Sequence, residues 1–312
     1  MTPLERTHRP VGTYAFSATI NILRHGSGDP TFQVAQGWVW LGLSTPDGPA
    51  TVALVADPSD AAVHARAWGD GAAWAVEHVP SLLGADDDPS GFEPRHESIA
   101  AAWRRFSGWR VTRSSLVLQS LVPACIEQRV TGREAFAAHR LLVRRHGAPA
   151  PGPGGDLGLF VPPAPRDWAK IPSWDWIRAG VDAGRSGAAV AASRHAARLE
   201  ECSGLAPGDA LRRLRAVPGV GEWTAAETSQ RALGDADAVS FGDFHVAKDV
   251  GWALTGAAVD DDGLRDLLEP YAGHRYRVQA LVALAGLHRP RRGPRRPPPT
   301  HLPRSGRHSL PR

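Results

Sequence analysis

A turn in the C-terminal half of the chain has residue types and spacing suited to binding a phosphate group. Helical segments are predicted on both sides of it, over Ala210–Ala216 and Glu222–Leu233. The turn consists of four residues, Pro218, Gly219, Val220 and Gly221. Its glycines allow a sharp bend and the close approach of another chain. Their N–H groups, with the start of the next helix, form an anion site suited to a nucleic-acid phosphate, although such a turn alone is more typical of a plain helix cap.

The residues after this turn add a carboxylate at a second predicted helix start. Trp223, Thr224 and Ala225 follow the turn directly. After one helix and a loop, Asp243 stands behind a permissive glycine, just before a predicted helix over His245–Leu254. A carboxylate at this place is commonly an N-cap. It is also the group that stabilises positive charge developing on a neighbouring substrate.

In this combination the chain resembles the helix-hairpin-helix DNA glycosylases, specifically the DNA-3-methyladenine glycosylase II family. In that family the hairpin Pro-Gly-(Ile/Val)-Gly-x-Trp-Thr-Ala is followed, one helix and a loop later, by a catalytic aspartate. Residues 115–135 resemble the family helix that ends in a glutamine and a wedge residue, and residues 275–286 resemble its last helix. The resemblance covers residues 13–288, and its most specific part runs from the hairpin to Asp243.

The resemblance implies a role for each matching residue. Asp243 is expected to be catalytic, because cleavage of an N-glycosidic bond gives the sugar oxocarbenium character that a carboxylate stabilises while it orients water. The turn residues and Thr224 are expected to bind the DNA backbone. Gln128 and Arg129 are expected to fill or brace the stack that a flipped base leaves, with Arg129 where the family has a bulky apolar wedge.

Trp223 determines the subclass that the resemblance implies. In the relatives that also nick the strand, this position holds the lysine that forms a Schiff base, and tryptophan cannot form an imine. The cysteine cluster of the iron–sulfur relatives is also missing, since Cys125 and Cys202 are the only cysteines. We therefore expect a monofunctional glycosylase with no lyase activity and no catalytic metal. The family implies at most a structural monovalent cation held by hairpin carbonyls.

The expected base pocket contains Trp223, Tyr271 and Glu227. Alkylated purines such as 3-methyladenine carry positive charge, and electron-rich rings attract such bases by about 0.5–2 kcal/mol. Glu227 departs from the family pattern, which places an aromatic residue one helical turn beyond Trp223. A carboxylate there favours a cationic base electrostatically, or indicates a different substrate. Aromatic residues at helical spacing are usually core residues, which remains an alternative for Tyr271.

Two other functions stay open. The first is a DNA-binding module that keeps the hairpin but has lost turnover, with Arg129 and Glu227 as signs of that loss. The second is a glycosylase for deaminated or oxidised bases. Replacing Asp243 by asparagine separates the enzyme from the binding module, and a panel of lesions separates the two enzymes.

Patterning along the chain predicts an α+β protein, with an N-terminal antiparallel sheet domain packed on an all-α helix-hairpin-helix domain. Alternation over Phe16–Ile22 predicts a strand, and helical periodicity dominates after the Asp-Pro-Ser-Gly segment that ends at residue 91. The expected parts are a flexible N-terminus (1–12), a β-rich domain (13–90), the helical glycosylase domain (91–288) and a disordered Arg/Pro-rich tail (289–312).

Composition limits the remaining possibilities. The 312 residues carry a net charge of +4, but eight of the 36 basic residues are arginines of the tail, leaving 28 against 32 acidic ones. DNA binding must therefore depend on local groups of the body, although the tail could add salt-dependent affinity. With no apolar run of membrane-spanning length and no secretory signal, we expect a cytoplasmic monomer that binds double-stranded DNA and no membrane.

Overall fold

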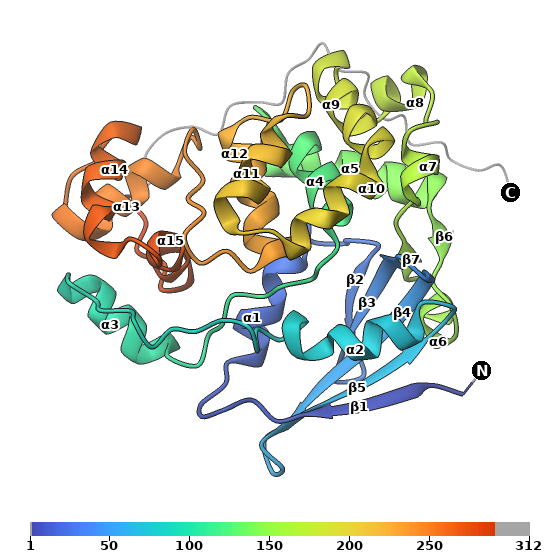
Figure 1. Cartoon of the computed structure of the whole chain (residues 1–312), viewed down its shortest axis with the longest axis horizontal. Coiled ribbons are helices and arrows are strands. Elements are labelled where there is room, and N and C mark those ends of the chain that lie inside the picture. Colours follow the sequence, from blue (N-terminus) through green and yellow to red (C-terminus); the bar gives the residue numbers. More distant parts are fainter. Residues whose placement is uncertain (1, 291–312) are drawn as a thin grey trace, which may run out of the picture.

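A five-stranded antiparallel sheet forms the N-terminal part of the chain in the computed structural model, which describes residues 2–290 (Figure 1). The spatial order is β1-β5-β4-β3-β2. The strands are β1 (Leu4–His8), β2 (Phe32–Ala35), β3 (Trp38–Thr45), β4 (Gly48–Asp57) and β5 (Ala62–Trp68). Each pair from β2 to β5 is a hairpin between chain neighbours, and β1 closes the far edge by pairing Leu4 with Ala67 and His8 with Val63.

The expectation of a flexible stretch over residues 1–12 is wrong for residues 4–8, which form β1. This strand is mostly exposed and lacks the apolar alternation by which strands are found in a sequence. It forms because the edge of β5 offers unpaired backbone groups. Arg6 adds two hydrogen bonds across to α2 (Ala72–Leu82), donating to the carbonyls of Val76 and Glu77.

The strand predicted over residues 16–22 is also wrong. Phe16–Ile20 forms the short helix α1, followed by a 3₁₀ turn over Asn21–Leu23. Over so few residues an apolar pattern fits both the strand period and the helical period, because Phe16, Ile20 and Leu23 also share one helical face. A backbone hydrogen bond from Ala15 N–H to Gly108 O, 2.9 Å, ties the start of this helix to the segment after α3 (Glu97–Phe106).

Each face of the sheet is covered. On one face α2 packs on alternate residues of the strands, including Leu41, Leu43 and Val52. The other face carries Trp40 and Trp68, and the segment 148–161 lies over it. This segment holds β6 (Ala148–Pro149), α6 (Pro153–Asp156) and β7 (Phe160–Val161).

The helical part of the chain has two lobes with separate cores. The first lobe contains α4 (Val117–Glu127), α5 (Gly132–His146), α7 (Pro165–Trp168), α8 (Ser173–Arg178), α9 (Ala183–Arg194), α10 (Ala196–Glu200), α11 (Pro207–Arg215) and α12 (Glu222–Thr228). The second lobe contains α13 (Val246–Thr255), α14 (Asp261–Leu268), α15 (Arg275–Leu284) and, from much earlier in the chain, α3. Figure 1 shows α3 below α15 and apart from the first lobe.

Local sequence explains where several helices begin. Thr131 and Glu134 form a capping box that starts α5, and Asp182 and Asp260 cap α9 and α14 with their side chains. The helix predicted over 222–233 is continuous but changes its winding, since Ser229–Leu233 forms a π-helical turn. Such π-turns occur frequently at functional sites.

Among the described residues, no helix is both long and apolar enough to cross a membrane. The Arg/Pro-rich tail expected over 289–312 lies outside the described residues from residue 291 onward.

Candidate active site

The predicted hairpin is formed by α11, the turn after it, and α12. Gly219 has a left-handed backbone (φ +84°), and a Cβ built on it would lie 2.8 Å from Cβ of Ala188 in α9. The turn is closed by a hydrogen bond from Val220 N–H to Val217 O, 3.0 Å, and Val220 is buried. Gly221 is different, because its backbone is extended and a Cβ there would meet nothing within 4 Å.

The first turn of α12 offers backbone amides on this open side. Gly221 is its N-cap residue, and no side-chain oxygen caps the helix. The helix hydrogen bonds begin with Ala225 N–H to Gly221 O, 3.0 Å. Amides in this position are suited to an anion, since the helix dipole adds a partial positive charge.

Gln128, which is half-buried, braces the hairpin. Its Nε2 donates to Gly219 O and to Thr224 Oγ1, both at 2.9 Å. Thr224 is 2% exposed, so its hydroxyl faces Gln128 and the protein interior. Both residues were expected at the DNA surface, and their positions indicate that they hold the turn in shape. Arg129, the next residue, is exposed and has a left-handed backbone (φ +56°), which is uncommon for a non-glycine residue.

Asp243 bonds to backbone amides at the start of α13 with only one of its carboxylate oxygens. Oδ1 accepts from the amides of His245 (2.7 Å) and Val246 (3.0 Å) at the start of α13. No hydrogen bond from a described residue reaches Oδ2. Gly242 before it has φ +86°, and its N–H donates to Asp261 Oδ2 at 2.8 Å. The turn thus holds a half-buried carboxylate with one oxygen available.

Glu227 connects the hairpin to the Asp243 segment. It lies on α12 one helical turn beyond Trp223, and its Oε1 accepts from Ser240 Oγ at 2.5 Å. Ser240 stands three residues before Asp243, whose N–H donates to Ser240 O at 3.2 Å. This contact brings α12 and the Asp243 segment, which belong to different parts of the helical domain, to one site. Trp223 is half-buried, and its indole N–H has no hydrogen-bond partner among the described residues.

Tyr271 lies elsewhere. It is 3% exposed in the core of the second lobe, beside Phe92. Its hydroxyl bonds to His96 Nδ1 (2.7 Å) and accepts from Arg95 N–H (3.1 Å), and burial raises its pKa. These contacts are those of a core residue, and they tie the segment before α3 to the segment before α15.

Three residues that the sequence did not single out form hydrogen bonds with Glu227 or with Ser240. Arg231, on the π-turn, donates to Glu227 Oε2 at 2.6 Å. Gln230 and Gln279 both donate to Ser240 Oγ at 2.9 Å. The position of Arg231, four residues after Glu227 on a predicted helix, was a signal that could have been used. No sequence signal indicates that Gln279 of α15 reaches the same serine.

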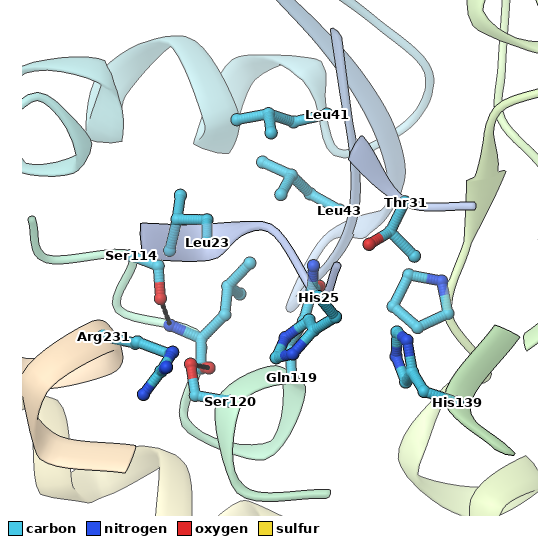
Figure 2. A pocket seen from close by; sticks show the side chains of 12 residues that line it. Leu23, His25, Thr31, Leu41, Leu43, Ser114, Gln119, Ser120, His139 and Arg231 are labelled. Atoms are coloured by element: carbon cyan, nitrogen blue, oxygen red, sulfur yellow. Dashed lines mark hydrogen bonds between the residues drawn. The ribbon is translucent and has the colours of Figure 1, made fainter. Parts of the chain in front are cut away.

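A small cavity lies beside Arg231, between the sheet and the first lobe (Figure 2). It has a volume of about 30 Å³ and is lined by Leu41 and Leu43 on the sheet side and by Gln119 and His139 among the polar groups. Burial lowers the pKa of His139 to about 4, and its Nδ1 has no hydrogen-bond partner among the described residues. The space suffices for one or two water molecules.

The described residues contain no cluster of three or more His, Cys, Asp or Glu side chains that could hold a metal ion. A monovalent cation at the hairpin stays an expectation. Two of the turn carbonyls already accept hydrogen bonds, Val217 O from Val220 and Gly219 O from Gln128.

Comparison with known proteins gives a consistent result at the level of the fold. No family model matches the sequence, and no curated protein matches it. Among solved structures, a 3-methyladenine DNA-glycosylase from Archaeoglobus fulgidus superposes with a TM-score of 0.73 at 16% identity, over 89% of this chain and 97% of that one.

Two further structures come from complexes with DNA. A Clostridium acetobutylicum 8-oxoguanine glycosylase/lyase, bound to duplex DNA with cytosine opposite 8-oxoguanine, has a TM-score of 0.67 at 12% identity (92% of this chain, 98% of that one). A fission-yeast (Schizosaccharomyces pombe) 3-methyladenine DNA glycosylase bound to abasic DNA has a TM-score of 0.50 at 16% identity (63% and 94%). The chain therefore has the α+β fold of these helix-hairpin-helix DNA glycosylases, as the sequence predicted.

Proposed function

We propose that this protein is a monofunctional DNA glycosylase that hydrolyses the N-glycosidic bond of damaged purines in duplex DNA. The observation that carries the proposal is the Glu227–Ser240 contact. It joins the hairpin helix, which bears Trp223, to the segment that bears Asp243. In this proposal a phosphate anchor, an aromatic side chain and an available carboxylate oxygen form one site, on a fold shared with DNA glycosylases.

In this proposal Asp243 acts on the sugar. Its Oδ1 is fixed by two amides of α13, and Oδ2 has no such partner among the described residues. A carboxylate held in this way needs no reorganisation to stabilise an oxocarbenium ion, and it can orient the attacking water. Capping and catalysis are therefore compatible, since each uses a different oxygen.

Trp223 supports hydrolysis without strand cleavage. An imine intermediate requires an amine, and the indole at this position has none to offer. Lys248 is not a substitute in this structure, because its Nζ donates to Phe244 O (3.0 Å) and lies 3.8 Å from the Phe244 ring centre. The Clostridium protein is a glycosylase/lyase, so the two activities must be tested separately for this chain.

We infer that the DNA backbone binds at Gly221 and the first turn of α12, and that Arg129 enters or flanks the gap left by the flipped base. Both residues are exposed. They lie on either side of Gln128, which is bonded to the turn. DNA is the partner in two of the structures with the same fold, which supports a duplex as the ligand.

Alkylated purines are the proposed substrate class, because a cationic base has a weakened glycosidic bond and is attracted by the face of Trp223. An oxidised base is the second candidate, favoured by the similarity to the 8-oxoguanine enzyme at nearly the same TM-score. The fold likeness does not separate these two, since fold and substrate are independent.

The test is a single-turnover assay on three duplexes: one methylated in bulk, one with a single hypoxanthine and one with 8-oxoguanine opposite cytosine. Released base is measured directly, and strand breaks are measured with and without alkali. Base release with breaks only after alkali is the expected result on the methylated duplex. Breaks without alkali would contradict the argument from Trp223. Tight binding with no base released from any duplex would contradict the enzymatic proposal and favour a binding module.

A further inference from the structure

The contacts around Ser240 form a buried network that spans three parts of the molecule. Ser240 is fully buried, and its Oγ donates to Glu227 and accepts from Gln230 and Gln279. A serine hydroxyl has one hydrogen to donate and two lone pairs that accept, so all of its hydrogen-bonding positions are occupied. Its backbone N–H also donates to Gln279 Oε1 at 3.0 Å. This segment is thereby bonded to α12, the π-turn and α15 at once.

Glu227 has no free oxygen with which to recognise a base. Oε1 accepts from Ser240, and Oε2 is paired with Arg231, which also donates to the Glu227 carbonyl at 2.9 Å. The pair is mostly buried, with side chains 12% and 16% exposed. A buried carboxylate with its charge compensated by an adjacent guanidinium is a structural element rather than an attractor of cations.

Arg231 extends the network to the 3₁₀ turn after α1. Its Nε donates to Ile22 O at 3.3 Å, and the backbone carbonyl of Arg231 accepts from Ser114 N–H at 3.0 Å. Figure 2 shows the Arg231 side chain next to Ser114 at the edge of the cavity between the sheet and α4. The π-turn that carries Arg231 is therefore bonded on both sides, to the 3₁₀ turn that contains Ile22 and to the segment before α4.

We propose that Ser240, held by Glu227 and Gln279, is a positioning residue for Asp243, and that Glu227 acts through Ser240 and does not recognise the base. The proposal deepens the proposed function and depends on it for its kinetic part. Physically, Gly242, Phe244 and His245 around Asp243 are exposed, so the hydrogen bonds that anchor this turn decide where the carboxylate lies. The turn is anchored at the start of α13, at Gly242 by Asp261, and at Ser240. A displacement of about 1 Å at such a group lowers rates on the order of 10²-fold.

The kinetic test uses Ser240→Ala, with Ser193→Ala as its matched control. Ser193 is also a buried serine, but its hydroxyl donates only within its own helix, to Ala189 O at 2.7 Å. Ser240→Ala should lower the single-turnover rate at least about tenfold with little change in the Kd for duplex DNA, whereas Ser193→Ala should leave both unchanged. In an Asp243→Asn background Ser240→Ala should have no further effect, because both changes act on the same group.

Glu227→Gln separates positioning from recognition of charge. If Glu227 acts through Ser240, the variant should slow release of cationic methylated purines and of neutral hypoxanthine by the same factor. A loss confined to the cationic lesions would overturn the proposal and assign Glu227 to the base pocket. An unchanged single-turnover rate for Ser240→Ala would also overturn it. So would a double variant with Asp243→Asn whose rate loss is the product of the two single losses.

Hydrogen exchange provides a readout that needs no activity. In the wild-type protein Asp243 N–H donates to Ser240 O, and Ser240→Ala should raise amide exchange in residues 240–243 by about tenfold or more, with Ser193→Ala as control. Unchanged exchange there would overturn the proposal even in an active enzyme. Faster exchange in Ser240→Ala, combined with a wild-type protein that releases no base, would support the network and refute the glycosylase function.

Discussion

The two turns of the site are built in opposite ways. The hairpin turn is fixed by packing at its centre, with Val220 buried, Gly219 against Ala188 and a carbonyl bonded to Gln128, while Gly221 stays open. The Asp243 turn is held by a few hydrogen bonds, at Ser240, at Gly242 and at the start of α13, and Phe244 is 69% exposed. The difference follows from what each turn would do. A phosphate anchor works through backbone amides, which need a rigid frame, whereas a catalytic carboxylate needs one fixed oxygen and open space at the other.

This contrast predicts that substitutions in the hairpin turn act mainly on stability and DNA affinity. Substitutions at the Asp243 turn should act mainly on rate. Four variants test it, beginning with the largest expected effect.

Asp243→Asn should lower the rate of base release by about 10²–10³-fold, the usual cost of removing one electrostatic stabiliser. Asparagine caps a helix about as well as aspartate, so the melting temperature and the Kd for duplex DNA should stay close to wild type. Single-turnover release, thermal unfolding and titration of DNA measure the three quantities. A variant that releases base at the wild-type rate would remove Asp243 from the mechanism.

Gly219→Ala should lower the free energy of unfolding by roughly 2–3 kcal/mol, measured by urea denaturation. Its new Cβ would lie 2.8 Å from Cβ of Ala188, and the residue would keep a left-handed backbone. Overpacking and strain of this kind each cost about 1–3 kcal/mol. Wild-type stability in this variant would show that the turn is not rigid, and the contrast between the two turns would fail.

Gln128→Met should cost about 1–2 kcal/mol of stability and weaken DNA binding severalfold. The change keeps the length of the side chain but removes hydrogen bonds to Gly219 O and Thr224 Oγ1, each worth about 1 kcal/mol. Gln33→Met, on the exposed edge strand β2, is the control and should change neither quantity. If Gln128→Met weakens DNA binding with no loss of stability, Gln128 contacts DNA directly, as the sequence had suggested.

Gly221→Ala should change stability by less than about 0.5 kcal/mol, because the backbone is extended and the added methyl group meets nothing. Its expected effect is on DNA, where the methyl group would occupy the side from which a phosphate approaches the α12 amides. A Kd for duplex DNA equal to that of the wild type would place the phosphate elsewhere. Comparison with Gly219→Ala separates packing from ligand contact within one turn.

The helical periods and the hairpin could be predicted because they depend on neighbours along the chain. Capping residues, turn glycines and apolar spacing act over a few positions, so α11, α12 and α13 were all accessible. The same reasoning failed at β1, because this segment becomes a strand through its pairing with the edge of β5. It also failed at residues 16–22, where so short a pattern fits two periods.

The sequence by itself determined the α+β class, the hairpin and the presence of a carboxylate one helix beyond it. Only the tertiary structure decided what surrounds them. It assigned Tyr271 to the core of the second lobe, directed Gln128 to Gly219, and brought Gln279 and Glu227 to the same serine. These contacts join residues 13 to 175 positions apart. Such pairings depend on how whole lobes pack, and no local propensity encodes them.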